Sequence, residues 1–416
     1  MSRIVYLLLV LLIALPVFAE KPVYREPNEY PILDEIIARR DSLQSIAADA
    51  REAVDQKYQD IADKKEDEEL SLRVDWSNYK LPYTPKQFDQ LWHNSPTPQF
   101  YTGTCWAFSS ASFMESEVKR ITGKEVKLSE MWIAYWEYVE KSRRFIQEYG
   151  HSALGEGSQG DGTTEIFKLY GTVTRDAYPG VKFEDGMHDH HELFGELESY
   201  LFWCRDNDMW DEDRALDYVK GILDKHLGVP PEVVEYNGET YTPKEFMNYL
   251  KIEPENYITC VSRMDRPFGE FGLLDVTDNW RRKEDYLNLS INDFMAVISN
   301  SIQSGCTVTI GGDNSEPGLD GQFDVALIPE WDIPSDYINQ GSREFRVLKK
   351  QTTDDHGIHV VGYTKLGGRL WYLIKDSNRS SRLGNHKGYY FFDSDYIKLK
   401  MLTFTTHIDN LMDYLP

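Results

Sequence analysis

The residue with the clearest chemical potential is Cys105, which stands directly before a strong helical pattern. Unpaired backbone N–H groups and the positive end of the helix macrodipole stabilise a thiolate at the first turn of a helix. Thr102, Gly103 and Thr104 are small, so a substrate can approach the sulfur closely. Gln99 precedes Cys105 by six positions, where its side-chain amide can donate to an oxyanion. This pattern predicts nucleophilic catalysis by the thiolate.

The helix that positions this cysteine is predicted by the spacing of its apolar residues. They recur at steps of three and four, the pattern of one buried helical face, at Ala107, Ala111, Met114, Val118 and Ile121. Gly123 then supplies a stop signal. An isolated cysteine at a helix start is usually a buried structural residue, but the combined spacing of Gln99, Gly103, Cys105 and Trp106 favours a nucleophile.

Residues 99–110 resemble the active-site signature of papain-like cysteine peptidases, in which Cys-Gly-Ser/Ala-Cys-Trp surrounds the nucleophile. Gln99, Gly103, Cys105 and Trp106 match that signature. Thr102 replaces the first cysteine of the family pattern, so the disulfide that this cysteine normally forms is absent. The resemblance implies an oxyanion hole made by Gln99 and the backbone N–H of Cys105.

The resemblance also identifies a base and its orienting partner. The family's catalytic histidine precedes a small residue and lies seven positions before the tyrosine of a Gly-Tyr pair, which here favours His356 over His359. An odd step along a strand places His359 on the other face. The family's orienting asparagine falls on Asp376, and its shielding tryptophan falls on Asn378. A carboxylate accepts the imidazole N–H at least as well as an amide, and an alternative register makes Asn378 the orienting residue.

Residues 154–162 form a glycine-rich segment that precedes a helix predicted over 163–170. No strand–loop–helix unit surrounds the glycines, so a phosphate-binding loop is the weaker interpretation. A glycine-bearing loop lines the substrate cleft of papain-like enzymes. The resemblance therefore implies that Ser158, Gln159 and Gly160 contact the substrate.

The distance from Cys105 to His356 is 251 positions, whereas ordinary papain and cathepsin chains need about 130–150. About 100 extra residues, mostly helical by pattern, therefore form an insertion at about 180–305. Helices are predicted there over 192–204, 211–227, 243–250 and 290–304. This layout resembles the bleomycin hydrolase or aminopeptidase C branch, in which a C-terminal arm enters the cleft and restricts the enzyme to free N-termini. Residues 410–416 would form that arm.

Strand signals dominate the last part of the chain, over residues 308–310, 358–363, 370–375, 388–392 and 398–404. The predicted fold class is therefore α+β and papain-like. A helical half carries the nucleophile, a largely antiparallel sheet half carries the histidine, and a cleft between them forms the active site.

A histidine cluster and the remaining cysteines offer other chemistry. His188, His190 and His191 lie beside acidic residues, but their spacing matches no metal-ligand pattern, so a solvated polar loop is favoured over a metal site. The chain has four cysteines in all. With Cys105 as a free nucleophile, the other three allow at most one disulfide, which is no disulfide framework.

Residues 1–19 have the pattern of a secretory signal peptide, with Arg3 before an apolar run and a small-residue cleavage site; an uncleaved membrane anchor is the alternative. Residues 20–71 form a charged N-terminal segment that contains a long helix over 32–69. That helix either packs on the catalytic domain, predicted over 72–416, or pairs with another helix as a coiled coil. A net charge of −24 argues against a nucleic-acid partner.

The sequence as a whole predicts an exported thiol peptidase, periplasmic or secreted, with aminopeptidase action on peptide substrates. It needs no cofactor or metal, has no stable membrane insertion after signal cleavage, and allows a homo-oligomer. Two other functions stay open. One is a catalytically lapsed, peptide-binding relative, which the changes to Asp376 and Asn378 motivate. The other is an acyl transferase that uses the same Cys-His-Asp trio.

Overall fold

The computed structural model describes residues 25–26, 29–68, 70, 72–181, 186–314 and 317–416. The chain divides into two compact units, residues 1–71 and 72–416. The predicted signal peptide lies outside the described residues. Within those ranges, no helix combines the length and the apolar character needed to cross a bilayer.

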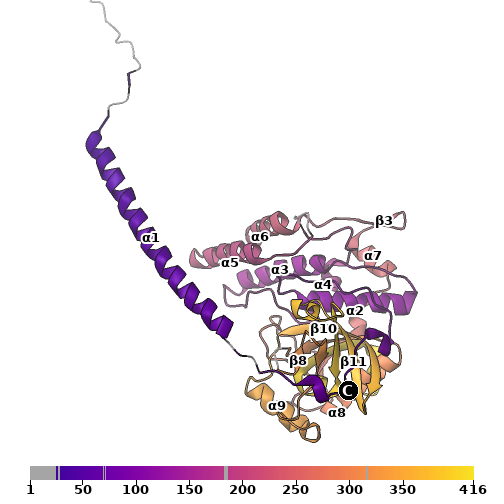
Figure 1. The fold of residues 1–416 in the computed structure, drawn as a ribbon. Helices are drawn as coiled ribbons and strands as arrows, with labels where there is room; N and C mark the ends of the chain where they lie inside the picture. The colour runs from indigo at the N-terminus through magenta and orange to yellow at the C-terminus, as the bar shows by residue number, and fades with distance from the viewer. Residues whose placement is uncertain (1–24, 27–28, 69, 71, 182–185, 315–316) are drawn as a thin grey trace, which may run out of the picture. The chain divides into compact units, whose positions relative to one another are not determined.

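The first unit contains the long helix α1, Pro31–Glu68 (Figure 1). This confirms the helix predicted over 32–69. Side-chain amides support it at i,i+4 spacing, since Gln56 donates to Asp60 at 2.7 Å and Gln59 donates to Asp63 at 2.7 Å. The apolar side chains of α1 are exposed. Both the packed helix and the coiled-coil partner stay predictions.

The second unit begins with a largely helical half that follows a short strand, β1 (Asp89–Gln90). The helices of this half are α2 Cys105–Thr122, α3 Glu130–Gln147, α4 Gly162–Tyr170, α5 His191–Asp206, α6 Glu212–Leu227 and α7 Pro243–Tyr249. Their apolar faces share one core. The hairpin β2 (Val234–Tyr236) and β3 (Glu239–Tyr241) lies before α7. The predicted insertion helices are confirmed within a few residues.

Local signals explain where these helices begin and end. Gly123 closes α2 with a φ of 74°, a left-handed conformation that glycine adopts without strain. The Ser129 hydroxyl accepts the N–H of Trp132 at 2.9 Å and caps α3. Thr242 and Glu245 form a capping box at the start of α7.

The other half is an eleven-stranded sheet in the order β5-β6-β4-β13-β7-β10-β11-β12-β9-β8, with β1 paired to β10. Its pairs are antiparallel except β4–β6 and β12–β9. Its strands are β4 Tyr257–Val261, β5 Phe271–Gly272, β6 Tyr286–Asn288, β7 Val308–Gly312, β8 Leu319–Asp320, β9 Val325–Ala326, β10 His356–Leu366, β11 Arg369–Lys375, β12 Tyr389–Asp393 and β13 Met401–His407. Three further helices accompany them: α8 Ile291–Gln303, α9 Gln340–Leu348 and α10 Ser394–Lys400.

Short 3₁₀ helices join these elements. They are η1 Trp76–Asn78, η2 Pro85–Gln87, η3 Pro254–Asn256, η4 Ser335–Tyr337, η5 Arg379–Arg382 and η6 Ile408–Asn410. One sequence expectation is incomplete and another is wrong. The inserted region contains the predicted helices, but its strands β4, β5 and β6, which the sequence did not indicate, join the main sheet. Residues 398–400 belong to α10, so the last strand starts only at Met401.

Both faces of the central strands are covered. On β11, Tyr372 and Ile374 face a core that includes residues of α8 and α10, whereas Trp371 and Leu373 face a core closed by the segment before α2. Residues 367–368, both glycines with φ of 64° and 83°, form the two-residue turn that joins β10 to β11. This hairpin places the start of β10 beside the end of β11.

Candidate functional site

Cys105 is the first residue of α2, and its position relative to the sheet depends on a close approach by β10. A Cβ on Gly357 would lie 3.0 Å from Ser109 Oγ and 3.3 Å from Trp106 Cα, so glycine makes room for the strand to pass close to the first turn of α2. The contact brings His356, the neighbour of Gly357, to the same hollow as Cys105.

His356 and Asp376 form a buried pair at the adjoining ends of β10 and β11. The N–H at Nε2 of His356 donates to Asp376 Oδ1 at 2.7 Å. Burial opposes the charged imidazole, but the Asp376 carboxylate and Cys105 together raise the pKa of His356 well above its usual 6.5. Burial likewise opposes the Asp376 carboxylate, yet His356 lowers the pKa of that carboxyl group. This geometry favours an imidazolium beside the sulfur.

Asn378, the alternative orienting residue, and His359, the alternative base, contact other groups. The Asn378 side chain accepts the backbone N–H of Ser380 at 3.4 Å and caps η5. His359 is buried, and its Nδ1 lies 2.8 Å from Ser112 Oγ in the middle of α2. The structure therefore pairs the side chains of Asp376 and His356. Asn378 contacts Asp376 only through its backbone N–H, which donates to Oδ1 at 3.1 Å, and the described contacts of His359 include neither residue.

Gln99 is buried beside the same pair. Its Nε2 donates to the carbonyl of Thr102 at 2.6 Å, and its Oε1 accepts the hydroxyl of Ser377 at 2.7 Å. One hydrogen of the side-chain amide remains for an oxyanion, because the amide nitrogen carries two. The backbone N–H of Cys105 has no hydrogen-bond partner among the described residues. Both groups that the resemblance assigns to the oxyanion hole thus keep a donor.

The glycine-rich segment lies near Cys105, the position that the resemblance implies. Ser158, Gln159 and Gly160 line the hollow beside Cys105. The first two also have structural contacts, since the Ser158 hydroxyl donates to Glu137 and the Gln159 amide donates to Asp354. These contacts hold the segment in place at the edge of the hollow.

The sequence reasoning did not identify Glu156 as a residue of this region. The N–H of Gly103 donates to Glu156 Oε2 at 2.6 Å, and Trp106 Nε1 donates to the Glu156 carbonyl at 3.0 Å. A Cβ on Gly103 would lie 2.8 Å from the Cβ of Glu156. Gly103 therefore admits a neighbouring loop, and Glu156 fastens that loop to the cysteine segment.

The hollow beside Cys105 opens between α2 and the sheet. Besides residues of α2, β7, β10, β13 and the glycine-rich segment, its lining includes three carboxylates, Asp278, Asp354 and Asp355. We call it the acidic hollow. Asp354 and Asp355 directly precede His356 and could have been noted from that position, but no sequence signal marks Asp278.

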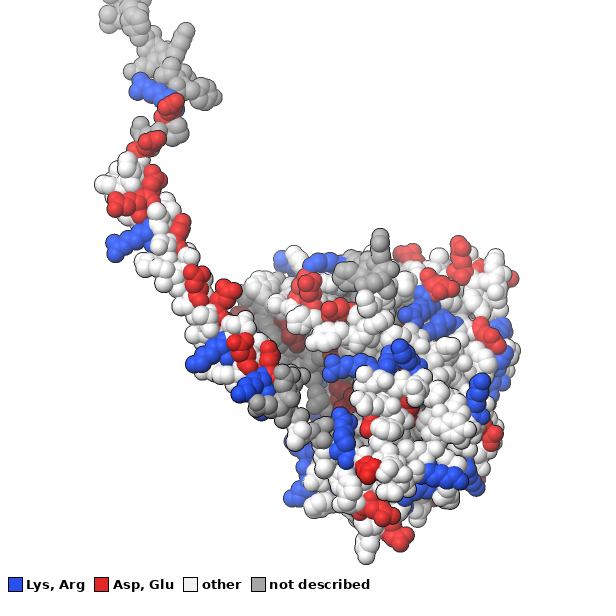
Figure 2. All heavy atoms as spheres, viewed as in Figure 1, with Lys and Arg blue, Asp and Glu red and all other residues white. Residues whose placement is uncertain are grey.

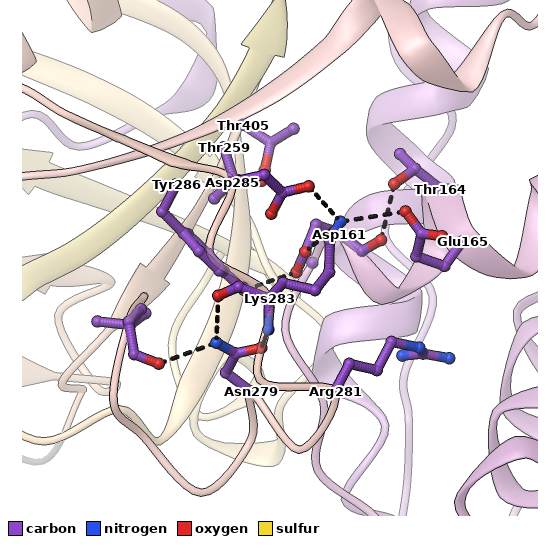
Figure 3. Close-up of polar contacts among 12 residues, drawn as sticks. Asp161, Thr164, Glu165, Thr259, Asn279, Arg281, Lys283, Asp285, Tyr286 and Thr405 are labelled. Atoms are coloured by element: carbon purple, nitrogen blue, oxygen red, sulfur yellow. Dashed lines mark hydrogen bonds and ion pairs between the residues drawn. The ribbon is translucent and has the colours of Figure 1, made fainter. Parts of the chain in front are cut away.

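Figure 3 shows ion pairs between the start of α4 and the loop before β6. Lys283 Nζ lies 2.9 Å from Asp161, 3.1 Å from Glu165 and 3.0 Å from Asp285. The hydroxyl of Tyr286 donates to Asp161 at 3.0 Å. These contacts connect the start of α4, and with it the glycine-rich segment, to the loop that leads into β6.

The histidine cluster is not the solvated loop that the sequence suggested. His188 and His190 are buried, and the backbone of residues 188–190 bonds to Tyr101 next to the cysteine segment. Burial lowers the pKa of His188 to about 4, with His190 adding to the effect. No group of His, Cys, Asp or Glu in the described ranges could hold a metal ion. All four cysteines of the chain are free.

The expected C-terminal arm is also wrong. Leu411 is fully buried, and Tyr414 and Leu415 pack against the core that contains α8. None of the residues 410–416 lines the acidic hollow. On the face in Figure 2, acidic and basic side chains of the second unit are interspersed.

No protein-family model and no curated protein matches this chain. Among solved structures, PepW from Lactobacillus rhamnosis HN001 (DR20) matches with a TM-score of 0.65 and 18% identity, over 80% of this chain and 83% of that one. The digestive procathepsin L 3 of the Tenebrio molitor larval midgut is 15% identical over 80% and 73%, with a TM-score of 0.35.

A chain from a study of the mite allergens Blo t 1 and Der p 1 is 14% identical over 82% and 75%, with a TM-score of 0.38. The fold assignment rests on the PepW match and on the arrangement of α2 against the sheet. The chain therefore has the mixed α+β fold of the papain-like cysteine peptidases.

Proposed function

We propose that this protein is a cysteine-type peptidase of the aminopeptidase C kind that hydrolyses peptides through a thioester acyl-enzyme. The observation that carries the proposal is the buried His356–Asp376 pair, 2.7 Å between Nε2 and Oδ1, which opens onto the same hollow as Cys105. A thiol at a helix N-terminus beside a base with its own orienting acceptor is the arrangement that nucleophilic acyl transfer needs.

The mechanism follows from these positions. His356 takes the proton of Cys105, and the sulfur attacks the carbonyl carbon of the scissile bond. The oxygen of the tetrahedral intermediate receives hydrogen bonds from the Gln99 amide and the Cys105 N–H. His356 returns its proton to the leaving amine, and a thioester remains. Water then attacks the thioester with His356 as base, which releases the acid and restores the thiol.

The aminopeptidase specificity and the export have weaker support. The length and helical content of the insertion favour the aminopeptidase C branch, but residues 410–416 provide no arm in the cleft. Any selectivity for a free N-terminus would therefore come from groups that line the acidic hollow. Export to the periplasm or beyond rests on the residue pattern of positions 1–19.

A fluorogenic aminoacyl amide tests the proposal directly. We expect turnover by the wild type, loss of turnover in Cys105→Ala, and loss of turnover when the substrate is N-acetylated. Turnover of the acetylated substrate would refute the aminopeptidase specificity alone. An activated ester separates catalysis from peptide binding, because an active enzyme gives a burst of one product equivalent and a lapsed one gives none. Amide products formed with added amines would instead indicate an acyl transferase.

A further inference from the structure

The acidic hollow carries negative charge that the proposed reaction does not use. Its lining contains Asp278, Asp354 and Asp355 but no lysine or arginine. Its one basic group, His356, is the proposed base for the Cys105 thiol. Asp355 points partly away, because its Oδ1 accepts the backbone N–H of Asn314 at 3.1 Å. The charge inside the hollow therefore comes mainly from Asp278 and Asp354.

Two polar groups in the hollow lack protein partners. Asp278 has no hydrogen bond and no ion pair within the described part of the chain. Thr403 is only 5% exposed and lines the hollow, yet its hydroxyl makes no hydrogen bond to any described residue. Asp278 is half-buried, and Thr403 is a buried residue whose hydroxyl is not sealed from the hollow. Both groups are therefore free to form hydrogen bonds with a molecule that enters the hollow.

The pKa values of the carboxyl groups in the hollow favour a cationic ligand. Burial and the neighbouring Asp278 raise the pKa of Asp354 to about 7, although a hydrogen bond from Gln159 opposes this. Burial also raises the pKa of Asp278, against the attraction of Lys141. An entering positive charge would relieve both effects, because it favours the ionised form of each carboxyl group.

The basic side chains nearby do not line the acidic hollow. The Lys141 ammonium donates to two carbonyls of the 154–162 segment, including Gly155 at 2.7 Å. An adjoining hollow shares Asp278 and Asp354 and is lined by three arginines and a lysine, Arg144, Arg263, Arg282 and Lys350. Arg144 and Arg263 pair with glutamates outside the acidic hollow. The acidic hollow itself therefore has no lysine or arginine in its lining.

The two carboxylates are also held on rigid segments. Asn279, next to Asp278, donates to the carbonyls of Leu274 at 2.9 Å and Lys283 at 3.0 Å. Lys283 in turn binds the start of α4, as Figure 3 shows. Asp354 is fixed by Gln159. A site on segments fixed in this way binds with a smaller loss of conformational entropy.

We infer that the acidic hollow is a specificity site for a positively charged group of the substrate. The group is either the side chain of Lys or Arg near the scissile bond or the free α-ammonium of the peptide. Asp278 and Asp354 bind it, and the Thr403 hydroxyl adds a polar contact. This inference rests on the proposed function and names its substrate class.

Matched fluorogenic peptides test the inference on the full chain at pH 7.5. Each carries lysine, norleucine or glutamate at one of the two residues before the scissile bond, with and without an N-terminal acetyl group. Norleucine keeps the aliphatic length of lysine without its charge. We expect kcat/KM for lysine to exceed that for norleucine by about tenfold or more, as for a contact between opposite charges that is partly desolvated, and glutamate to be the poorest. A preference for lysine that persists in the acetylated peptides identifies the side chain as the bound group. If the site binds the α-ammonium instead, the lysine and norleucine peptides react alike, and acetylation lowers kcat/KM for both.

The variants Asp278→Asn and Asp354→Asn should each reduce the lysine-to-norleucine ratio severalfold. Asp336→Asn, in the exposed η4 helix outside the hollow, is the matched control and should keep the wild-type ratio. The ratio is internal to each variant, so a partial loss of folded enzyme does not affect it. Equal rates for lysine and norleucine, together with no effect of acetylation on either rate, would overturn the inference, while turnover through Cys105 would still support the peptidase.

Failure of the proposed function has a separate readout. If no peptide is hydrolysed, the affinities of the lysine and norleucine peptides are measured on Cys105→Ala by fluorescence anisotropy. Tighter binding of the lysine peptide, reduced by Asp354→Asn, would support the specificity site in a peptide-binding protein. Equal affinities that acetylation of the peptides does not change would overturn it.

Discussion

The sharpest prediction concerns Asp376, whose carboxylate accepts the N–H of His356 at 2.7 Å in a buried setting. Asp376→Ala removes the acceptor and leaves the imidazole free to rotate. A buried hydrogen bond to a charged group contributes about 1.5–3 kcal/mol, which corresponds to about 10- to 150-fold in kcat/KM. We expect a loss in this range, with little change in KM if substrate binding is unaffected.

Asp376→Asn separates orientation from charge. An amide oxygen still accepts the imidazole N–H, so substantial activity should remain. The carboxylate is a main reason that the pKa of His356 lies well above 6.5. The imidazolium persists below that pKa and is lost as the pH rises through it, so removing the negative charge should move the alkaline limb of the pH–rate profile to lower pH.

The assay is the pH–rate profile of kcat/KM for the wild type and three variants. Asn378→Ala is the control, because Asn378 caps η5 and its side chain does not reach His356. It should cost about 1 kcal/mol of stability, the usual effect of losing a cap, and leave the alkaline limb in place. If Asp376→Ala matched the wild type in rate and pH limbs while Asn378→Ala was damaged, the assignment of the pair would be wrong.

Three further predictions follow from burial and ion pairing. Iodoacetamide should label Cys105 far faster than the three other cysteines, which are buried; equal labelling by mass spectrometry would contradict the assignment. Lys283→Met should lower stability by about 3 kcal/mol, because it leaves carboxylates unpaired in a largely buried network. Lys168→Met, at a more exposed pair, should change Tm much less, and equal shifts would count against the network. Removal of residues 411–416 should lower Tm by exposing part of the sheet core without adding endopeptidase activity, which gel analysis of a protein substrate would detect.

Several structural features could be predicted because their causes are local. Periodic apolar residues and a glycine stop define α2, so the placement of Cys105 at its first residue follows from a short segment. Ser129 and Thr242 cap the helices that they precede. The alternation of β11 and the glycine turn before it identify a strand and a hairpin.

Other features depend on partners far away in the chain. Strand β4 is short, follows helices and pairs with β13, more than a hundred residues later, so its own sequence does not distinguish it from the helical insertion. His188 and His190 look like loop residues, but the tertiary packing against Tyr101 buries them. Residues 410–416 look like a free end in the sequence, yet Leu411 is part of the core that contains α8, and Tyr414 and Leu415 pack against that core.

The sequence by itself determined that a cysteine begins a helix and that a histidine begins a strand with an acidic residue near the end of the next. Only the tertiary structure decided that Asp376 contacts His356 and that Asp278 and Asp354 line one hollow beside the sulfur. The physical reason is that helices and turns are encoded by neighbours in the chain, whereas a charged cavity forms where several separate segments meet. Asp278 lies about 170 positions from Cys105, and packing of the sheet against α2 and α4 brings the two together.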